Sequence, residues 1–255
     1  MSRVTLKAQQ QETEVQKLYR KYLEYPALVK DASKGEILFQ ILSNLPVERN
    51  LRPITTPYTV FTLIALNIAI FMISISVGLE RFLLDWAFIP GSGEVFPEVL
   101  FSLFLHGGYA HIMGNMYFLW LMGDNVEDIM GKRLFCLVYF SAGFIGFLVS
   151  AMSGPEGIPH IGASGAVSGI MAAYFLLFPK AQFLVRFFIV VSFPISSFLY
   201  IFFWIGINIL NYLLGGNSGV AWGAHIAGFV VGLVITWIFK RRHGIPDQMK
   251  NLPFH

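Results

Sequence analysis

The sequence has few charged residues and a single cysteine. Charged residues make up 13% of its 255 residues, whereas 55% are hydrophobic and the mean hydropathy is +0.62. This balance excludes an ordinary soluble globular protein, in which about a quarter of the residues are charged. The lone Cys136 excludes an intramolecular disulfide and a cysteine-based metal site. The net charge is only +3 and the basic residues lie at the ends of apolar segments, so no nucleic-acid partner is expected.

Long hydrophobic runs are present instead of charge. A helix needs about 20 apolar residues to cross a hydrocarbon core about 30 Å thick. Six segments approach or exceed this length, near residues 59–77, 110–125, 135–152, 164–178, 187–214 and 221–239. The fourth is short, and the fifth is long for one span, so we expect it to bend or to begin late at Pro194. The sequence therefore predicts an all-α membrane protein with six transmembrane helices.

The distribution of basic residues indicates the orientation of these spans. Basic residues lie before the first span, between the second and third, between the fourth and fifth, and after the sixth: Arg49, Arg52, Lys132, Arg133, Lys180, Arg186, Lys240, Arg241 and Arg242. The other connections carry acids or no charge, with Arg81 as the exception. By the positive-inside rule, both termini are expected to be cytoplasmic. The beginning of the fourth helix then lies near the outer face.

Residues 1–56 are polar and charged and contain no spanning segment. Apolar residues recur there at helical spacing in two stretches separated by Pro26 and a turn at 33–35, which predicts two short helices. No apolar core follows the basic start, so no signal peptide is expected. The chain therefore divides into a helical cytoplasmic N-terminal extension (1–56), a membrane domain (57–243) and a short C-terminal tail (244–255). Regulation, partner docking and topology control all remain open as roles of the extension.

Ser164 opens an apolar helix in the segment GASGAVSG, directly after a loop rich in turn-forming residues. A hydroxyl at the point where a loop enters a membrane helix is shielded from bulk water but close to it, which suits a nucleophile. Serine and glycine also allow membrane helices to pack closely, and for this segment taken alone packing is the more common role. Other polar residues must therefore distinguish the two roles.

Three further polar residues lie at the depth expected for Ser164. His111 and Asn115 are four residues apart, so they share one face of a helix. His225 lies early in the last span, again near the outer side. A lone histidine is a hydrogen-bonded core residue about as often as a functional one. Because polar residues within a membrane are costly and are usually functional, their occurrence together favours chemistry.

Small residues at four-residue spacing predict that the fourth and sixth helices approach closely. The two stripes are Gly165, Gly169 and Ala173 in the fourth helix and Ala224, Gly228 and Gly232 in the sixth. Such an approach brings His225 against Ser164, where the imidazole can act as general base. Candidate donors for the oxyanion are His111, the Asn115 amide and the backbone N–H of Ser164. The sixth span has no carboxylate, so the expected mechanism is a Ser–His dyad.

Four segments, HGGYAHIMGN, GDNVEDIMG, GASGAVSG and AWGAHIAGF, occur in this order along the chain. Together they resemble the signature of the rhomboid family of intramembrane serine proteases, over residues 58–243. The resemblance implies a bundle of six transmembrane helices with a short central fourth helix, and a water-accessible cavity that holds the serine. It also implies that Ser164 is the nucleophile and His225 the general base, with His111 and Asn115 as the oxyanion-stabilising pair.

The resemblance assigns supporting roles to further residues. His106 matches a histidine near the active site, Glu127 a structural acid after the second span, and Gly228 the glycine that lets the sixth helix approach the fourth. Gly165, which directly follows Ser164 and belongs to the small-residue stripe of the fourth helix, is a further supporting residue. No metal or other cofactor is implied. The expected partners are transmembrane protein substrates, which approach laterally through the lipid bilayer, and a prokaryotic cell membrane is the default location.

Two positions depart from the family pattern. The Trp-Arg pair common in the first loop of the family is absent, and Pro97-Glu98 stand at about that place. The aromatic residue that often follows the nucleophile by one turn and packs on the base is Ser168 here. Neither departure removes a catalytic group, but the second concerns how His225 is oriented.

Several other functions compete with a serine protease. A catalytically inactive rhomboid-like protein that binds transmembrane clients would keep the fold, but would normally lose the serine or the histidine. No His-Glu-x-x-His motif indicates a metalloprotease. An aspartyl protease needs two aspartates within spans, whereas Asp124 and Asp128 lie at a helix end. A transporter would show repeated halves, which the sequence lacks. The inactive relative therefore stays as the alternative.

Overall fold

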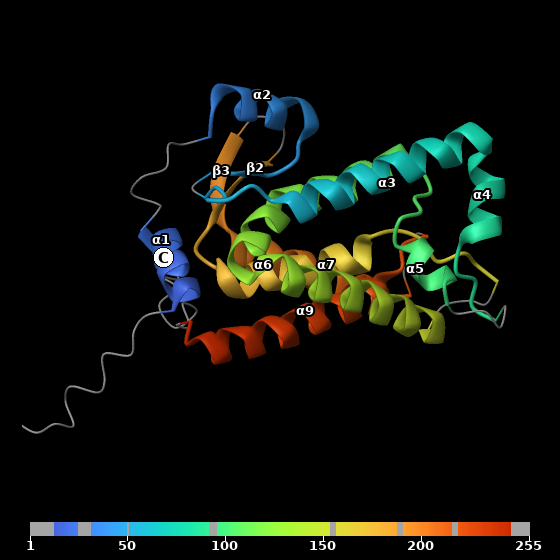
Figure 1. Cartoon of the computed structure of the whole chain (residues 1–255). Helices are drawn as coiled ribbons and strands as arrows, with labels where there is room; N and C mark the ends of the chain where they lie inside the picture. Colours follow the sequence, from blue (N-terminus) through green and yellow to red (C-terminus); the bar gives the residue numbers. More distant parts are fainter. Residues whose placement is uncertain are drawn as a thin grey trace, which may run out of the picture.

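The computed structural model describes residues 13–24, 32–49, 51–91, 96–153, 157–187, 191–215 and 219–245. This part of the chain is mostly helical, and its long helices lie side by side between two ends (Figure 1). One end carries a small β-sheet and α2 (Lys34–Ser43), and the other carries α4 (Leu79–Trp86) and α5 (Glu98–Ser102).

Within the described residues, three helices are long and apolar enough to cross a membrane. They are α3 (Tyr58–Val77), α6 (Tyr109–Ser153) and α9 (Trp222–His243). The shorter apolar helices are α7 (Ser164–Leu177) and α8 (Ser197–Leu213). Large apolar side chains stay exposed on the outer faces; on α3, for example, Met72 and Ile73 are 56% and 53% exposed. Exposed apolar surface on helices of this length identifies a membrane protein.

Helix α6 consists of two helical segments that meet at Gly131. Its 45 residues would extend roughly 68 Å as one straight helix, more than twice the core of about 30 Å. Gly131 interrupts the helix with φ 73° and ψ 160°, angles that essentially only glycine adopts. The first segment is antiparallel to α3. Tyr109, where this segment begins, lies against Phe71 in the second half of α3, with ring centroids 5.3 Å apart. Lys132, just after the segment ends, has its Nζ 4.9 Å from the ring centroid of Tyr58, the first residue of α3. The break falls between the predicted second and third spans.

The prediction of an all-α chain is wrong in one region, where an antiparallel sheet has the strand order β1–β2–β3. The strands are β1 (Val47–Glu48), β2 (Gln182–Phe187) and β3 (Val191–Ser196). The predicted fifth span therefore begins as strands, and its helix starts only after Pro194. A short apolar run rich in β-branched and aromatic residues has the same pattern in a buried strand as in a buried helix. Pro194 is tolerated because β3 is an edge strand.

The N-terminal extension contains the two predicted helices and is attached to the bundle. Helix α1 (Glu14–Glu24) buries Tyr19, whose hydroxyl donates to the carbonyl oxygen of Leu177 at the end of α7. Strand β1 pairs Val47 with Leu184 of β2. The extension therefore contacts the bundle through both a buried side chain and backbone hydrogen bonds.

Helix α2 begins at the residues predicted to form a turn, 33–35. Ser33 is the N-cap, and its hydroxyl accepts from the backbone N–H of Glu36 while the Glu36 carboxylate accepts from the backbone N–H of Ser33. This capping box stabilises a helix start, so Lys34 and Gly35 join the first turn. Pro26, predicted to separate the two helices, lies outside the described residues.

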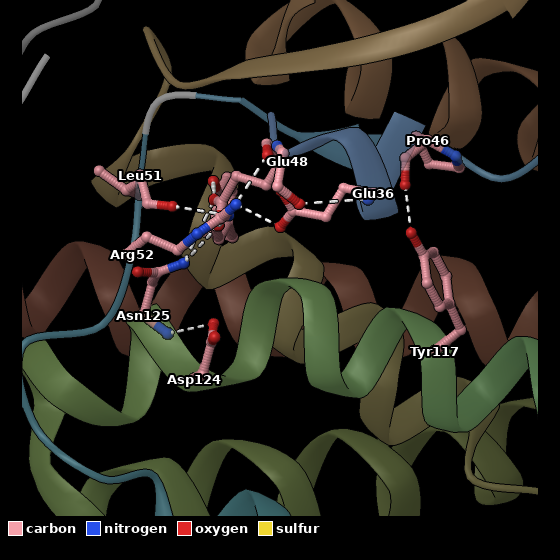
Figure 2. A network of polar contacts seen from close by, with 10 residues as sticks. Glu36, Pro46, Glu48, Leu51, Arg52, Tyr117, Asp124 and Asn125 are labelled. Carbon is pink, nitrogen blue, oxygen red and sulfur yellow. Dashed lines mark hydrogen bonds and ion pairs between the residues drawn. The ribbon is translucent and has the colours of Figure 1, made fainter. Parts of the chain in front are cut away.

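A buried polar cluster lies where β1 meets α6 (Figure 2). Glu48 is only 3% exposed and accepts hydrogen bonds from Asn125 Nδ2, at 3.1 and 3.2 Å, and from the Tyr174 hydroxyl. Arg52 lies 3.9 Å from Glu48 and also pairs with a carboxylate of α2. Burial, and after it the nearby Asp124 carboxyl, raise the pKa of Glu48 well above its ordinary value of 4.5.

Candidate active site

Ser164 is the first residue of α7, a helix enclosed by the other helices. Residues 165–174 are all buried, whereas Ser164 is half-buried at the N-terminal end. With 14 residues α7 is about 21 Å long, which is shorter than a hydrocarbon core of about 30 Å. The preceding loop therefore reaches into the bundle, where the backbone N–H of Gly162 donates to the carbonyl oxygen of Ser102 at 2.9 Å.

Helices α7 and α9 touch through glycine backbones. A Cβ added to Gly228 would lie 2.1 Å from the carbonyl oxygen of Gly165, and one added to Gly232 would lie 2.1 Å from that of Gly169. Only glycine permits backbones to approach this closely. The close approach that the two small-residue stripes predict is therefore present in the structure.

The same contact determines the relative positions of Ser164 and His225. The backbone of Ala224 lies against two glycines: its carbonyl oxygen would be 3.3 Å from a Cβ added to Gly165 and 2.9 Å from a Cβ added to Gly146 of α6. Ser164 directly precedes Gly165, and His225 directly follows Ala224. The two side chains therefore start from neighbouring backbone positions at one depth of the bundle.

The ring of His225 contacts residues of α8 that the sequence reasoning did not identify. Its Nδ1 lies 2.7 Å from Oδ1 of Asn208. The Trp204 ring stacks on it, with the centroids 5.8 Å apart and the planes 27° apart, and Trp222 meets it edge-on at 6.1 Å. One signal was available in the sequence, because an asparagine within an apolar span is costly and needs a partner.

His111 and Asn115 of α6 face the loop before Ser164. A Cβ on Gly162 would lie 2.5 Å from His111 Nε2 and 3.6 Å from Asn115 Nδ2, and Gly162 has a φ of 110° that favours glycine. Asn115 Nδ2 is buried without a hydrogen-bond partner among the described residues. The backbone N–H of Gly107 donates to His111 Nδ1 at 3.4 Å, which leaves Nε2 to carry the proton of the neutral ring. Both side chains can therefore donate hydrogen bonds toward this loop.

The two supporting polar residues lie in different places. His106 is buried beside His111, with ring centroids 5.0 Å apart, and its Nδ1 lies 3.3 Å from the carbonyl oxygen of Phe104. Glu127 lies away from the site and accepts hydrogen bonds, at 3.0 and 2.9 Å, from two backbone N–H groups in the first turn of α3. Its contacts are those of a helix cap rather than of a reacting group.

The two departures from the family pattern have different structural settings. Ser168 is fully buried, and its Oγ has no hydrogen-bond partner within the described part of the chain. The aromatic ring on His225 is instead Trp204, which comes from α8. Pro97 and Glu98 begin the short helix α5.

Among the residues that the structure describes, no group of three or more His, Cys, Asp or Glu side chains could hold a metal ion.

Known proteins resemble this chain, and one family model covers the part that carries the site. Residues 93–242 match the family model described as Rhomboid domain. The human presenilin-associated rhomboid-like protein, mitochondrial, is 28% identical over 180 residues, which cover 69% of this chain and 46% of that protein. RHOMBOID-like protein 12, mitochondrial, of Arabidopsis thaliana is 32% identical over 159 residues, which cover 55% and 45%. The putative rhomboid protease YdcA of Bacillus subtilis is 31% identical over 80 residues, which cover 31% and 40%.

The chain spans less than half the length of each of these relatives. Two of the three are named as mitochondrial proteins. These relatives, two named as mitochondrial and one from a bacterium, do not single out the prokaryotic membrane expected from the sequence. The comparisons and the apolar helices support a membrane location without a named compartment.

Proposed function

The chain belongs to the rhomboid family, and from this premise we propose that it is an intramembrane serine endopeptidase. The proposed reaction hydrolyses a peptide bond in or near the transmembrane segment of a membrane-protein substrate. The observation that carries the proposal is the glycine contact between α7 and α9, because it brings the backbone positions of Ser164 and His225 together. Polar side chains at such a place in a membrane protein are costly unless they serve a function.

In the proposed mechanism, Ser164 Oγ attacks the scissile carbonyl carbon while His225 takes the hydroxyl proton. His225 then returns this proton to the leaving amine, and water hydrolyses the acyl-enzyme by the same route. His111, Asn115 and the backbone N–H of Ser164 would donate to the oxyanion. The unpartnered Nδ2 of Asn115 supports this role, because a donor already satisfied within the protein would not be available to the developing charge.

We also propose six spans, formed by α3, the two segments of α6, and helices α7, α8 and α9. The break at Gly131 supports counting α6 twice. Basic residues gather at the end that carries the sheet: Lys132 of α6 lies over the ring of Tyr58, the first residue of α3, and Lys240 Nζ donates to the carbonyl oxygen of Leu176 at 2.8 Å. By the positive-inside rule this end faces the cytoplasm with both termini, and the site opens near the outer face.

A second candidate function is a catalytically inactive rhomboid-like protein that binds transmembrane clients. The names of the human and Arabidopsis relatives favour it, because they call those proteins rhomboid-like and not proteases. An exposed apolar surface could receive a client segment whether or not the serine reacts. The presence of both Ser164 and His225 favours the enzyme.

Labelling of the purified chain in detergent with a fluorophosphonate probe distinguishes the two functions. We expect wild type to be labelled, Ser164→Ala to be unlabelled, and His225→Ala to react at least about 10²-fold more slowly, since general-base catalysis contributes about 10²–10⁴-fold. Ser168→Ala is the matched control, because it removes a buried serine one turn further along α7. Labelling that persists in Ser164→Ala would refute this nucleophile. A folded wild type that is not labelled would favour client binding.

A further inference from the structure

We propose that Asn208 of α8 is a positioning residue that orients His225 for proton transfer. This inference rests on the proposed function and deepens it. The sequence predicts a dyad, because the helix that carries His225 has no carboxylate. The third group is instead an amide from a neighbouring helix, with Oδ1 placed 2.7 Å from Nδ1 of His225.

The hydrogen bonds of Asn208 determine which amide atom faces the histidine. Its Nδ2 donates to the carbonyl oxygen of Trp204, one turn earlier in α8, at 2.7 Å. Oδ1 is therefore the atom that faces His225. An amide oxygen can only accept a hydrogen bond, so Nδ1 of the neutral ring must carry the proton. The lone pair is then on Nε2, the ring nitrogen that remains to take the proton of a serine hydroxyl.

Surrounding rings restrict His225 further. Trp204 and Asn208 are four residues apart and share one face of α8, so the same face supplies a stacked ring and a hydrogen-bond acceptor. Trp222 closes another side of the ring edge-on. Asn208 is only 2% exposed, and a hydrogen bond shielded from water is electrostatically stronger than an exposed one. The orienting contacts that Ser168 cannot supply thus come from α8.

A second asparagine of α8 makes it possible to distinguish the contact with His225 from a hydrogen bond to the helix backbone. Asn211 also lies in α8, and its Nδ2 donates to the carbonyl oxygen of Ile207 at 2.8 Å, as Asn208 does to Trp204. Within the described chain, the hydrogen bond to His225 is made by Asn208. Asn211→Ala is therefore the matched control for Asn208→Ala, because both remove the same bond to the helix backbone.

The first test measures the rate of fluorophosphonate labelling of Ser164 in the full chain in detergent. We expect Asn208→Ala to slow labelling by about tenfold or more, which is the effect of losing one hydrogen bond that holds the reactive geometry. We expect Asn211→Ala to be labelled at the wild-type rate. The thermal unfolding midpoint of each variant is measured alongside, so that a change in folding is recognised. Equal rates in both variants would overturn the inference and leave the proposed function intact.

The variant Asn208→Asp gives a readout that a purely structural role would not change. Its carboxylate would keep an acceptor at Nδ1 and would also stabilise the protonated ring. Because labelling needs the neutral ring, the pH of half-maximal labelling should rise by about one unit or more. The rate at high pH should stay near that of wild type. An unchanged pH of half-maximal labelling would contradict direct contact between this position and His225.

Nitrogen NMR of histidine-labelled protein tests the contact without any activity. We expect the proton of His225 on Nδ1 in wild type and a shift toward Nε2 in Asn208→Ala, with His225→Gln assigning the signal. A proton on Nε2 in wild type would overturn the inference. If a folded wild type is not labelled, the proposed function fails, and this tautomer still decides whether Asn208 orients His225.

Discussion

Glycines determine how closely the helices carrying Ser164 and His225 approach each other. At Gly228 the atom that an added Cβ would meet, 2.1 Å away, is the carbonyl oxygen of Gly165. A backbone atom inside a helix cannot turn aside as the end of a flexible side chain can. At Gly206 of α8, by contrast, no atom beyond the adjacent backbone of the same helix lies within 4 Å of an added Cβ. The effect of one extra carbon therefore depends on its position in the bundle.

We expect Gly228→Ala to lower the free energy of unfolding by about 1–3 kcal/mol, as overpacking of a tight contact does. It should also slow fluorophosphonate labelling, because α9 must move away from α7. Gly206→Ala is the control and should leave labelling unchanged while slightly favouring the helix. Unfolding in detergent and the labelling rate measure the two effects. A wild-type labelling rate in Gly228→Ala would contradict a catalytic requirement for the close contact.

The boundaries of the elements follow local backbone chemistry more closely than hydropathy. The apolar run that continues into α8 contains strand residues until Ser196, whose hydroxyl accepts from the backbone N–H of Leu199 at 3.3 Å and caps the helix. In α6 the boundary is Gly131, which adopts angles outside the helical region. In both cases a single residue decides where a helix ends or begins.

Gly131→Ala should destabilise the protein by about 1–3 kcal/mol, the cost of holding a residue with a Cβ in a region of backbone angles that essentially only glycine occupies. The cost is conformational, because no atom beyond the adjacent backbone lies within 4 Å of the added Cβ. Gly114→Ala, at an equally open but helical position of the same element, should keep or slightly raise the stability. Thermal unfolding of both variants checks this, and equal midpoints would show that the turn at Gly131 is not constrained.

One carboxyl group joins parts of the molecule that are far apart in the sequence. Glu48 of β1 accepts hydrogen bonds from Asn125 of α6 and from Tyr174 of α7, and β1 itself pairs with β2. The N-terminal extension is therefore part of one end of the bundle, and this attachment is a structural role in addition to the roles that the sequence leaves open. Its protonation links the stability of the whole molecule to pH.

We expect the free energy of unfolding of wild type to fall as pH rises above about 4.5, relative to Glu48→Gln. The pKa of Glu48 is raised in the folded state, so above the ordinary value the folded state binds a proton that the unfolded state has lost. Stability present at low pH is then lost as pH rises toward the native pKa, at up to about 1.4 kcal/mol per unit. Glutamine has no such proton. Thermal unfolding across pH measures the difference.

Glu36→Gln is the control for the loss of a carboxylate partner of Arg52, since Glu36 also pairs with this arginine but is more exposed than Glu48. Glu36→Gln should therefore keep the loss of stability above about pH 4.5 that distinguishes wild type from Glu48→Gln, because Glu48 is still present. Parallel profiles of wild type and Glu48→Gln would contradict a protonated Glu48 in the folded state.

Several features of the protein could be predicted from the sequence because they depend on local properties. The membrane class follows from apolar runs of sufficient length, and the approach of α7 and α9 follows from small residues repeated every four positions. Ser164 and His225 could be singled out because each adjoins one of these stripes. The family itself was recognised from four short motifs, and the Rhomboid domain match agrees with it.

The sequence by itself thus determined the membrane class, the family, the candidate reactive residues and the close contact of two helices, since each depends on residues a few positions apart. The tertiary structure alone decided the sheet and the support of His225. Val47 of β1 pairs with Leu184 of β2, and Asn208 of α8 contacts His225 of the neighbouring helix α9. Local hydropathy and spacing describe what one segment prefers, but they do not specify which distant segment will meet it, so these contacts arise only when the chain packs.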